Sequence, residues 1–510
     1  MFNLQSFIAG VELSATPYGI LMMVIGTTIG AVFGAIPGLT GSIAIAILLP
    51  FTFYLEAPIA MALLVGVYVG GSFGGSIPAI LISTPGAPEA GMTVLDGAPM
   101  ARKGLSGKAL KTSLYSSCAA NFLSAITTTL FIMVLAKLAL KIGNAEYFGI
   151  AVFSIVLIAV LGSQGEWIKG LIAGLLGLIC SIVGSDPITG SLRFTFGNPD
   201  LMGGIQLIPV LIGLFVGSET LSSVRLTKET PKLSVDFKNN NAITKKDVKR
   251  CLPVVLSGSA IGSIIGALPG LNAAVSTTLN YSLAKRISKT PDEFGEGCIE
   301  GVAASEAANN GTVGPTLAPL LTLGIPGSGT AAIFMGALVI QGVQCGPGIM
   351  KDSAEVVYSI LFSLILCTIT LLIVGYGLIR IAQYIAFIPS ECLGPIVMMT
   401  CCAGIYSSNK SLTDVYVFLI FLLIGVLMKY LKMPVLPLLI AYLLGSLMEK
   451  NFRRALLVSN ASIGSAWGGI LASKIAVIFL GIAVLLLLYG MFGGFLAQFF
   501  RKKKGGEKNE

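Results

Sequence analysis

Four short motifs place proline and glycine inside long apolar runs, at positions where a broken helix would expose binding groups. The first is "GAIPGLTG", Gly34 to Gly41, within an uncharged run that extends from Leu13 to Leu55. Proline removes a backbone donor and glycine loosens the chain, so a membrane helix should break there. An unpaired backbone group in hydrocarbon costs several kcal/mol. The break therefore needs a partner other than lipid.

Broken membrane helices expose groups that bind small ions. The N-terminus of a half-helix carries partial positive charge and free N–H groups, which bind carboxylates without Arg or Lys. Unwound carbonyls and nearby hydroxyls bind small cations. Because the four motifs hold no basic side chain, an anion site there would depend on backbone dipoles and a bound cation. The polar side chains beside the breaks are neutral: Thr40, Ser42, Ser83, Thr84, Asn272, Ser276, Thr277, Thr322, Ser328 and Thr330.

The motif "SEAANNG" places Glu306, Asn309 and Asn310 before the last break. Asparagine amides in an apolar run need partners, so Asn309 and Asn310 could line a cavity or join two helices. Glu306 is interpreted as a helix-end residue rather than a coupling carboxylate. Asp96 is interpreted as a turn or cap residue before a basic loop.

The composition is that of a membrane protein. The 510 residues are 55% hydrophobic and 11% charged, with mean hydropathy +0.88, whereas soluble proteins carry about 25% charged residues. The net charge of +9 comes from basic residues in short loops, where they orient the chain in the membrane rather than bind nucleic acid. The chain contains no histidine, which excludes imidazole metal sites, triads and proton relays, and its nine cysteines show no metal-binding spacing.

Uncharged runs predict an all-α polytopic membrane protein with about 10–12 membrane segments. Four runs at the breaks are too long for one crossing, because 43 helical residues would reach about 65 Å across a core of about 30 Å. These four are Leu13–Leu55, Ala57–Pro88, Cys251–Ala284 and Ala307–Met350. The clearest single spans are Thr112–Ala136, Tyr147–Gly165, Gly170–Ser185, Leu201–Ser218, Val356–Ile379, Cys392–Asn409, Val415–Met428, Met433–Met448 and Ile475–Phe500.

The two halves of the chain carry the same pair of motifs in the same order. "IGAVFGAIPGL" (Ile29–Leu39) matches "IGSIIGALPGL" (Ile261–Leu271) at seven of eleven positions, and "PAILISTPG" (Pro78–Gly86) aligns with "PLLTLGIPG" (Pro319–Gly327). Breakers at matching positions of two halves usually indicate a transporter binding site. The alternative is a duplication kept only for packing, with glycines that let helices approach closely.

A basic polar stretch divides the chain into these halves. We predict a first membrane repeat over residues 1–224, a cytoplasmic linker over 225–250, a second membrane repeat over 251–465, and an extra C-terminal helix with a basic tail over 466–510.

The basic loop Met100–Lys111 should be cytoplasmic, and its non-basic counterpart Gln344–Glu355 could be outside, which predicts inverted repeats. The charged segment Glu449–Arg454 conflicts with this topology. Either the short span Met433–Met448 does not cross fully, or the topology is locally wrong.

The motifs together resemble one family, the TctA family, the large membrane subunit of the tripartite tricarboxylate transporters. The resemblance runs through "GAIPGLTG", "YVGGSFGGSIPAILISTPG", "LDGAPMARKG" and "GALPGLN". It continues in the long block "EAANNGTVGPTLAPLLTLGIPGSGTAAIFMGALVIQGVQCGPGIM".

The resemblance implies a permease that imports tricarboxylates such as citrate, or related carboxylates, by symport in a prokaryotic inner membrane. It implies two partners, a small TctB-like membrane subunit and a periplasmic TctC-like binding protein. It implies coupling to a Na⁺ or H⁺ gradient, with no other cofactor and no enzymatic activity.

The expected substrate site combines the carried-over Pro–Gly turns with the polar residues beside them. We also expect a Na⁺ ion near Gly38, Thr40, Gly270 and Asn272. The substrate-binding residues are Pro37, Gly38, Thr40, Ser83, Thr84, Pro85, Gly86, Pro269, Gly270, Asn272, Asn309, Asn310, Pro326, Gly327 and Ser328.

Two rivals come from other classes. An intramembrane enzyme needs converging carboxylates, His or Cys at membrane depth, and the long runs show no acidic pair. A passive channel usually shows a ring of charged residues or a repeated filter, and the duplicated breakers argue against one.

Overall fold

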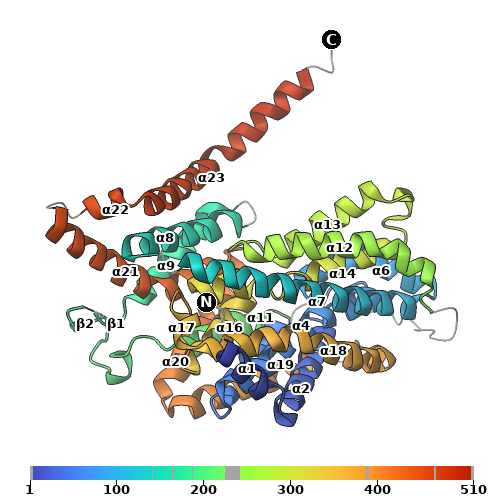
Figure 1. Cartoon of the computed structure of the whole chain (residues 1–510), viewed down its shortest axis with the longest axis horizontal. Helices are drawn as coiled ribbons and strands as arrows, with labels where there is room; N and C mark the ends of the chain where they lie inside the picture. Colours follow the sequence, from blue (N-terminus) through green and yellow to red (C-terminus); the bar gives the residue numbers. More distant parts are fainter. Residues whose placement is uncertain are drawn as a thin grey trace. The chain divides into compact units, whose positions relative to one another are not determined.

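The protein is almost entirely helical. The computed structural model describes residues 4–139, 142–163, 166–186, 188–223, 242–385, 390–463 and 467–506. Within these ranges nine helices are long and apolar enough to cross a membrane, and four shorter apolar helices accompany them (Figure 1). One two-stranded antiparallel sheet joins β1 (Gly184–Ser185) to β2 (Leu192–Arg193). The prediction of an all-α polytopic membrane protein is confirmed.

The chain forms two compact units. The first comprises Met1–Leu140 and Gln206–Leu427, and it contains all four predicted breaks. Its helices are α1 (Leu4–Ser14), α2 (Pro17–Ala35), α3 (Gly41–Thr52), α4 (Ala57–Gly74), α5 (Ser76–Leu81), η1 (Pro88–Ala90), α6 (Gly91–Arg102), α7 (Ser106–Ala139), α10 (Leu207–Leu211), η3 (Ile212–Gly217), α11 (Ser218–Ser223), α12 (Lys245–Ala267), α13 (Ala273–Ile287), η4 (Pro291–Glu293), α14 (Ile299–Asn310), α15 (Leu317–Leu323), α16 (Gly329–Ile340), α17 (Ile349–Asp352), α18 (Ala354–Ile385), α19 (Ser390–Asn409) and most of α20 (Leu412–Tyr430).

The second unit comprises Lys141–Ile205 and Met428–Glu510. Besides the small sheet it contains α8 (Asn144–Leu161), α9 (Trp167–Ser181), η2 (Pro199–Leu201), α21 (Val435–Ile463), α22 (Gly468–Ala472) and α23 (Lys474–Gly506). Each unit thus combines segments from both halves of the sequence. The sequence-based division into two repeats and a C-terminal helix stays a prediction; residues 225–241 of the expected linker lie outside the described residues, and α12 begins at Lys245.

Each of the four overlong runs is interrupted as predicted. The run Leu13–Leu55 forms α2 and α3, and Cys251–Ala284 forms most of α12 and α13. Ala57–Pro88 forms α4 and α5 before the second break. The last run, Ala307–Met350, begins inside α14. The helix starts at Ile299, whereas the uncharged run starts only after Glu306.

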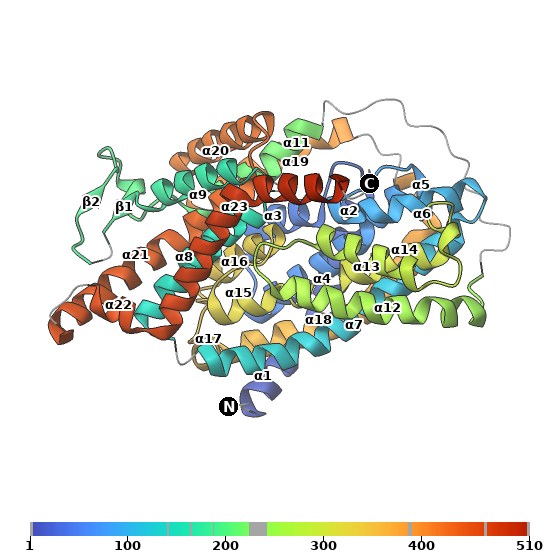
Figure 2. The same ribbon diagram turned by 90° about the horizontal axis from the view of Figure 1, so that it is seen from above.

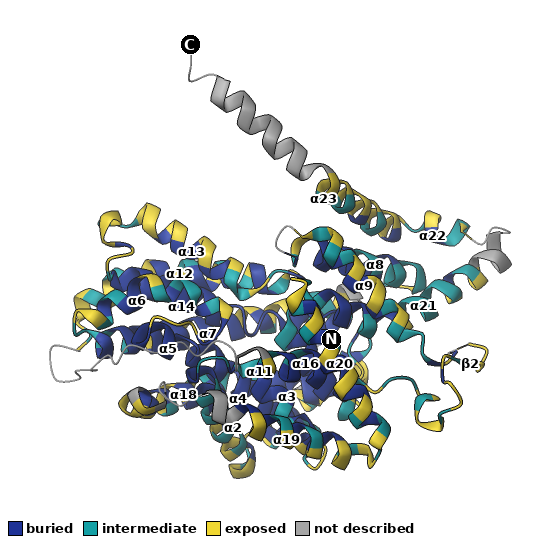
Figure 3. Ribbon diagram, turned by 180° about the vertical axis from the view of Figure 1, so that it is seen from behind, coloured by how far each residue is buried: buried dark blue, intermediate teal, exposed yellow. Residues whose placement is uncertain are grey.

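Glycines let α2 pack closely against α4, and they let α12 pack closely against α14. A Cβ at Gly30 of α2 would overlap the Val67 carbonyl of α4, and a Cβ at Gly70 of α4 would overlap the Thr27 carbonyl. In the second half, a Cβ at Gly262 of α12 would lie 2.7 Å from the backbone of Gly311. These close approaches bury all of α4 but its first residue and the whole of α14 (Figure 3). For these glycines the packing role is the one the structure shows.

Helices α12, α13 and α14 lie side by side, and α7 runs beside α12 and α14 (Figure 2). Helix α7 belongs to the first half of the sequence and the other three to the second. The first unit is therefore built from both halves of the sequence. Residues about 200 positions apart in the chain contact each other there.

The charged segment that conflicts with the predicted topology is helical, and two of its charged side chains form ion pairs. Glu449 and Arg453 lie inside the continuous helix α21. Arg453 binds Asp186 and Glu449, each at 3.0 Å, and Arg193 binds the same two carboxylates. Two positive and two negative side chains thus join α21 to the β1–β2 hairpin within the second unit. The charges of these four side chains cancel, whereas Lys450 and Arg454 of the same segment are outside this cluster.

Candidate functional site

The first break of each half has the same backbone conformation. Helices α2 and α12 end in an extended residue, Ile36 with φ −92° and Leu268 with φ −94°. Two residues later Gly38 and Gly270 adopt left-handed φ values of 83° and 86°. An L-residue pays roughly 1–2 kcal/mol for that conformation, so glycine is required at both turns. The sequence repeat is therefore also a repeat of local structure.

The second breaks match in part. Helices α5 and α15 end at Leu81 and Leu323, and the aligned residues Ser83 and Gly324 are both left-handed, with φ of 56° and 71°. The chains then diverge, because the second half starts α16 while the first half starts the short helix η1.

Three of the expected ligand side chains cap the helices that follow the breaks. Thr40 accepts a hydrogen bond from the Ile43 N–H at 3.3 Å, at the start of α3. Asn272 and Ser328 do the same for α13 and α16, at 3.2 and 3.1 Å. Their oxygens are N-caps in this conformation, while the remaining N–H groups of each first helical turn have no partner inside the helix. The partial positive charge of each helix N-terminus stays directed at the break.

Contacts link the four breaks to one another. The Gly270 N–H donates to the Gly327 carbonyl at 3.2 Å, which joins the two breaks of the second half. In the first half, Gly86 packs so closely on Gly34 that a Cβ would overlap the Gly34 carbonyl. The halves meet where Ser42 of α3 lies 2.6 Å from Thr330 of α16, hydroxyl to hydroxyl.

Two further hydrogen bonds cross between the halves beside the breaks. The Tyr68 hydroxyl of α4 lies 3.1 Å from that of Thr316, and the Asn309 amide of α14 donates to the Ser72 carbonyl of α4 at 3.0 Å. Tyr68 and Asn309 occupy aligned positions of the repeat. Asn309 thus joins two helices, the second of the alternatives that its sequence leaves open.

Asn310 is different from its neighbour. It is completely buried, and both polar atoms of its side chain lack a hydrogen-bond partner among the described residues. Leaving such a group unpaired costs roughly 1–3 kcal/mol. The Asn310 amide can donate two hydrogen bonds and accept one or two from a polar group that approaches it.

The expected site residues differ in exposure. Arg102 donates to Ser83 at 3.5 Å, so a basic side chain that lies outside the four motifs reaches one of them. No side-chain hydrogen bond in the described part of the chain joins Ser83 or Thr84 to the other three breaks. Buried residues are Gly86, Gly270, Asn309, Asn310, Pro326 and Gly327; partly exposed ones are Pro37, Gly38, Thr40, Pro269 and Ser328; exposed ones are Ser83, Thr84, Pro85 and Asn272.

Sequence reasoning missed the environment of Glu306. This residue lies one turn inside the end of α14 and is completely buried among hydroxyl groups, rather than at an exposed helix end. One signal was available: Ser113 and Ser117 are four residues apart, so a single helix face presents both.

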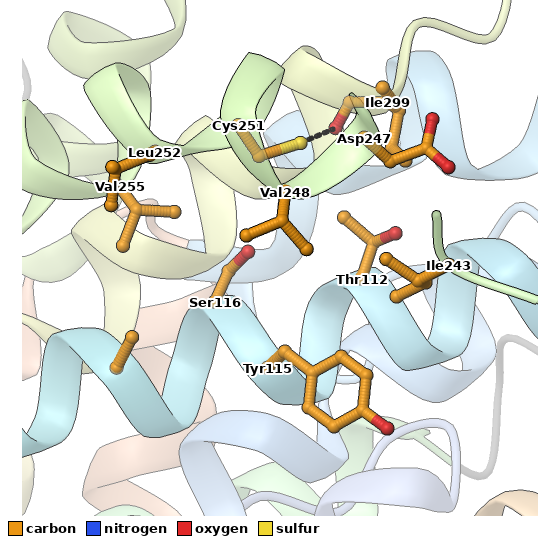
Figure 4. Close-up of a pocket in the computed structure, with 11 residues that line it drawn as sticks. Thr112, Tyr115, Ser116, Ile243, Asp247, Val248, Cys251, Leu252, Val255 and Ile299 are labelled. Atoms are coloured by element: carbon orange, nitrogen blue, oxygen red, sulfur yellow. Dashed lines mark hydrogen bonds between the residues drawn. The ribbon is translucent and has the colours of Figure 1, made fainter. Parts of the chain in front are cut away.

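A separate pocket of about 220 Å³ lies between α7 and α12 (Figure 4). Its lining is mainly apolar, including Val248, Leu252 and Val255, and it contains none of the expected site residues. It therefore does not serve as the candidate site.

Comparisons with known proteins agree with the motifs. Residues 20–440 match the model of the tripartite tricarboxylate transporter TctA family. An Agrobacterium vitis protein described as an uncharacterized 52.8 kDa protein in the TAR-I ttuC' 3'region is 34% identical over 455 residues, which cover 88% of this chain and 89% of that protein. A second Agrobacterium vitis protein, from the TAR-II ttuC' 3'region, is 33% identical over 199 residues, 39% of this chain and 82% of that protein. No solved structure matches the chain. This multi-pass membrane protein belongs to the TctA family of tripartite tricarboxylate transporters.

Proposed function

We propose that this chain is the permease subunit of a binding-protein-dependent secondary transporter, which imports tricarboxylates such as citrate, or related carboxylates, by symport with Na⁺ or H⁺. The observation that carries the proposal is the matched pair of left-handed breaks at Gly38 and Gly270, each followed at once by a helix N-terminus. Helix N-termini bind carboxylates through backbone N–H groups.

The residues around the breaks suit a carboxylate that must be released again. The helices α3, α13 and α16 each present an N-terminus, and the amide of Asn310 supplies unpaired donors and an unpaired acceptor nearby in sequence. Because backbone dipoles hold the anion, no buried ion pair has to break on release. We propose that backbone carbonyls and side-chain oxygens at Gly38, Thr40, Gly270 and Asn272 bind a coupling Na⁺.

The family implies that this chain works with partner subunits, and we propose which proteins they are. A tripartite transporter has two further subunits, which we propose are a small TctB-like membrane protein and a periplasmic TctC-like binding protein. We place the complex in a prokaryotic inner membrane, with the two sequence repeats inverted relative to each other. We propose neither a catalytic role nor a cofactor other than the coupling ion.

Uptake of labelled citrate tests this function. Proteoliposomes would contain this chain with its small subunit, and the binding protein would be added outside under a sodium or a proton gradient in turn. We expect accumulation that needs both the binding protein and one gradient. Flux that proceeds without either would identify a passive channel, and chemical conversion of citrate would identify an enzyme. Absence of citrate uptake under both gradients would exclude citrate and direct the search to other ligands of the binding protein.

A further inference from the structure

A completely buried carboxyl lies among hydroxyl groups in the first unit. Glu306 of α14 accepts a hydrogen bond from Thr93 of α6 at 2.5 Å on Oε1. On Oε2 it accepts hydrogen bonds from Ser113 and Ser117 of α7, at 3.1 and 3.4 Å. Helices α6 and α7 belong to the first half of the chain and α14 to the second, so the cluster spans the repeat.

Two more hydroxyls extend the cluster. Ser305 lies 3.0 Å from Thr93, and Ser76 of α5 lies 2.7 Å from Ser113, oxygen to oxygen. We call Ser76, Thr93, Ser113, Ser117, Ser305 and Glu306 the carboxyl cluster; all six residues are 0% exposed. The other five can each donate or accept a hydrogen bond through a rotating hydroxyl.

None of the hydrogen-bonding partners of Glu306 in the described part of the chain is basic. A buried carboxylate without a cation pays a desolvation cost of several kcal/mol, which hydrogen bonds repay only in part. The protonated form avoids that cost, and one hydroxyl then turns to accept its proton. The cluster can therefore satisfy the carboxyl in both protonation states with the same side chains.

Helix α14 packs against α4, η1, α6, α7, α12 and α13. Of these elements, η1 carries Glu89, a second carboxyl group of like charge when ionised. Like charge disfavours simultaneous ionisation of both. The neighbouring groups on the other elements have partners of their own: Tyr68 with Thr316, Asp96 with Tyr281, Arg250 with Glu300, and Lys108 with Asp247.

The cluster is tied to the breaks through α14. Glu306 precedes Asn309, which binds α4, by three residues, about one helical turn. Ser76 opens α5, whose end forms the second break of the first half. A rearrangement at the breaks would therefore change the distances from these hydroxyls to the carboxyl.

We propose that Glu306 is the proton-carrying carboxyl of the transport cycle, which rests on the transporter function proposed above. Its carboxylate takes a proton from hydronium on one side of the membrane, leaving water. After the conformational change it returns that proton to water on the other side.

The first test uses Glu306→Gln, which keeps the shape of the protonated carboxyl but cannot release a proton. We expect proton-driven uptake to fall at least tenfold in proteoliposomes, while exchange of labelled for unlabelled substrate continues. Glu355→Gln, at an exposed glutamate of α18, is the matched control and should keep uptake. Full proton-driven uptake by Glu306→Gln, loss of exchange together with uptake in a folded variant, or wild-type uptake driven by sodium alone would each overturn the proposal.

The second test needs no transport, so it separates this proposal from the proposed function. Infrared spectra of the purified chain are recorded over a pH titration, and we expect a carboxylic acid C=O band that titrates and is absent in Glu306→Gln. Ser117→Ala should shift this band because one hydrogen bond to the carboxyl is lost, whereas Ser116→Ala on the same helix should not. A spectrum without a titrating band assigned to Glu306 would overturn the proposal even if citrate uptake is confirmed.

Discussion

Alanine at Gly38 or Gly270 is expected to reduce substrate uptake by about tenfold or more. Both glycines have left-handed φ values, of 83° and 86°. A side chain there costs roughly 1–2 kcal/mol, and 1.4 kcal/mol corresponds to a factor of ten in a population. The strain falls on the turn that directs the N-terminus of α3 or α13 at the break. Initial rates of uptake in proteoliposomes, normalised to the inserted protein, measure the effect.

Gly190→Ala is the matched control, because this glycine of the β1–β2 hairpin has φ 71° and open space around its Cα. It imposes the same backbone strain at a position outside the breaks, and uptake should stay near the wild-type rate. Equal losses in all three variants would mean that general instability, and not the breaks, controls uptake. Wild-type uptake in Gly38→Ala and Gly270→Ala would assign the turns to packing.

Replacement of Asp96 by alanine is expected to destabilise the first unit by about 3–4 kcal/mol, because several buried donors lose a charged acceptor. One oxygen of this fully buried carboxylate accepts from the N–H groups of Gly295, Gly297 and Cys298, at 2.9, 3.0 and 2.7 Å. The other accepts from the Tyr281 hydroxyl at 2.7 Å. Cys298 is the N-cap residue of α14, so Asp96 of α6 caps a helix of the other half.

Thermal unfolding of the purified chain in detergent measures this loss. Asp292→Ala removes an exposed carboxylate from the same loop and should leave the melting temperature close to that of the wild type. Asp96→Asn should have a melting temperature between those of Asp96→Ala and Asp292→Ala, since its amide keeps one carbonyl acceptor but loses the charge. If Asp96→Ala has the same melting temperature as Asp292→Ala, the four hydrogen bonds contribute little to stability and α14 is held by packing alone.

The breaks were predictable because proline and glycine act locally. "AIPGL" and "ALPGL" each specify an extended residue followed by a left-handed glycine, and the structure has both turns where the sequence places them. The membrane helices were predictable for a similar reason, since apolar runs must be helical in lipid. The inverted orientation of the repeats stays a prediction.

The partners of individual polar residues were not predictable, because they depend on how the halves interleave. The sequence alone favours a local turn or cap role for Asp96, yet the N–H groups that donate to its carboxylate lie about 200 residues away, on the loop before α14. Glu306 was interpreted as a helix-end residue, yet α6 and α7 cover it with hydroxyls. Long-range packing decides the contacts of Asp96 and Glu306. The caps at Thr40, Asn272 and Ser328 are local instead, because each side chain accepts from an N–H group three residues further along the chain.

Hydrogen–deuterium exchange tests most directly whether backbone groups at the breaks hold the substrate. The whole chain in lipid nanodiscs would be labelled with and without the carboxylate that it transports, and exchange would be followed by mass spectrometry. We predict slower exchange in peptides that cover residues 36–43 and 268–275, with no change in the β1–β2 hairpin. Unchanged exchange at both breaks, in a preparation whose uptake is intact, would contradict the account and place the binding site elsewhere in the protein.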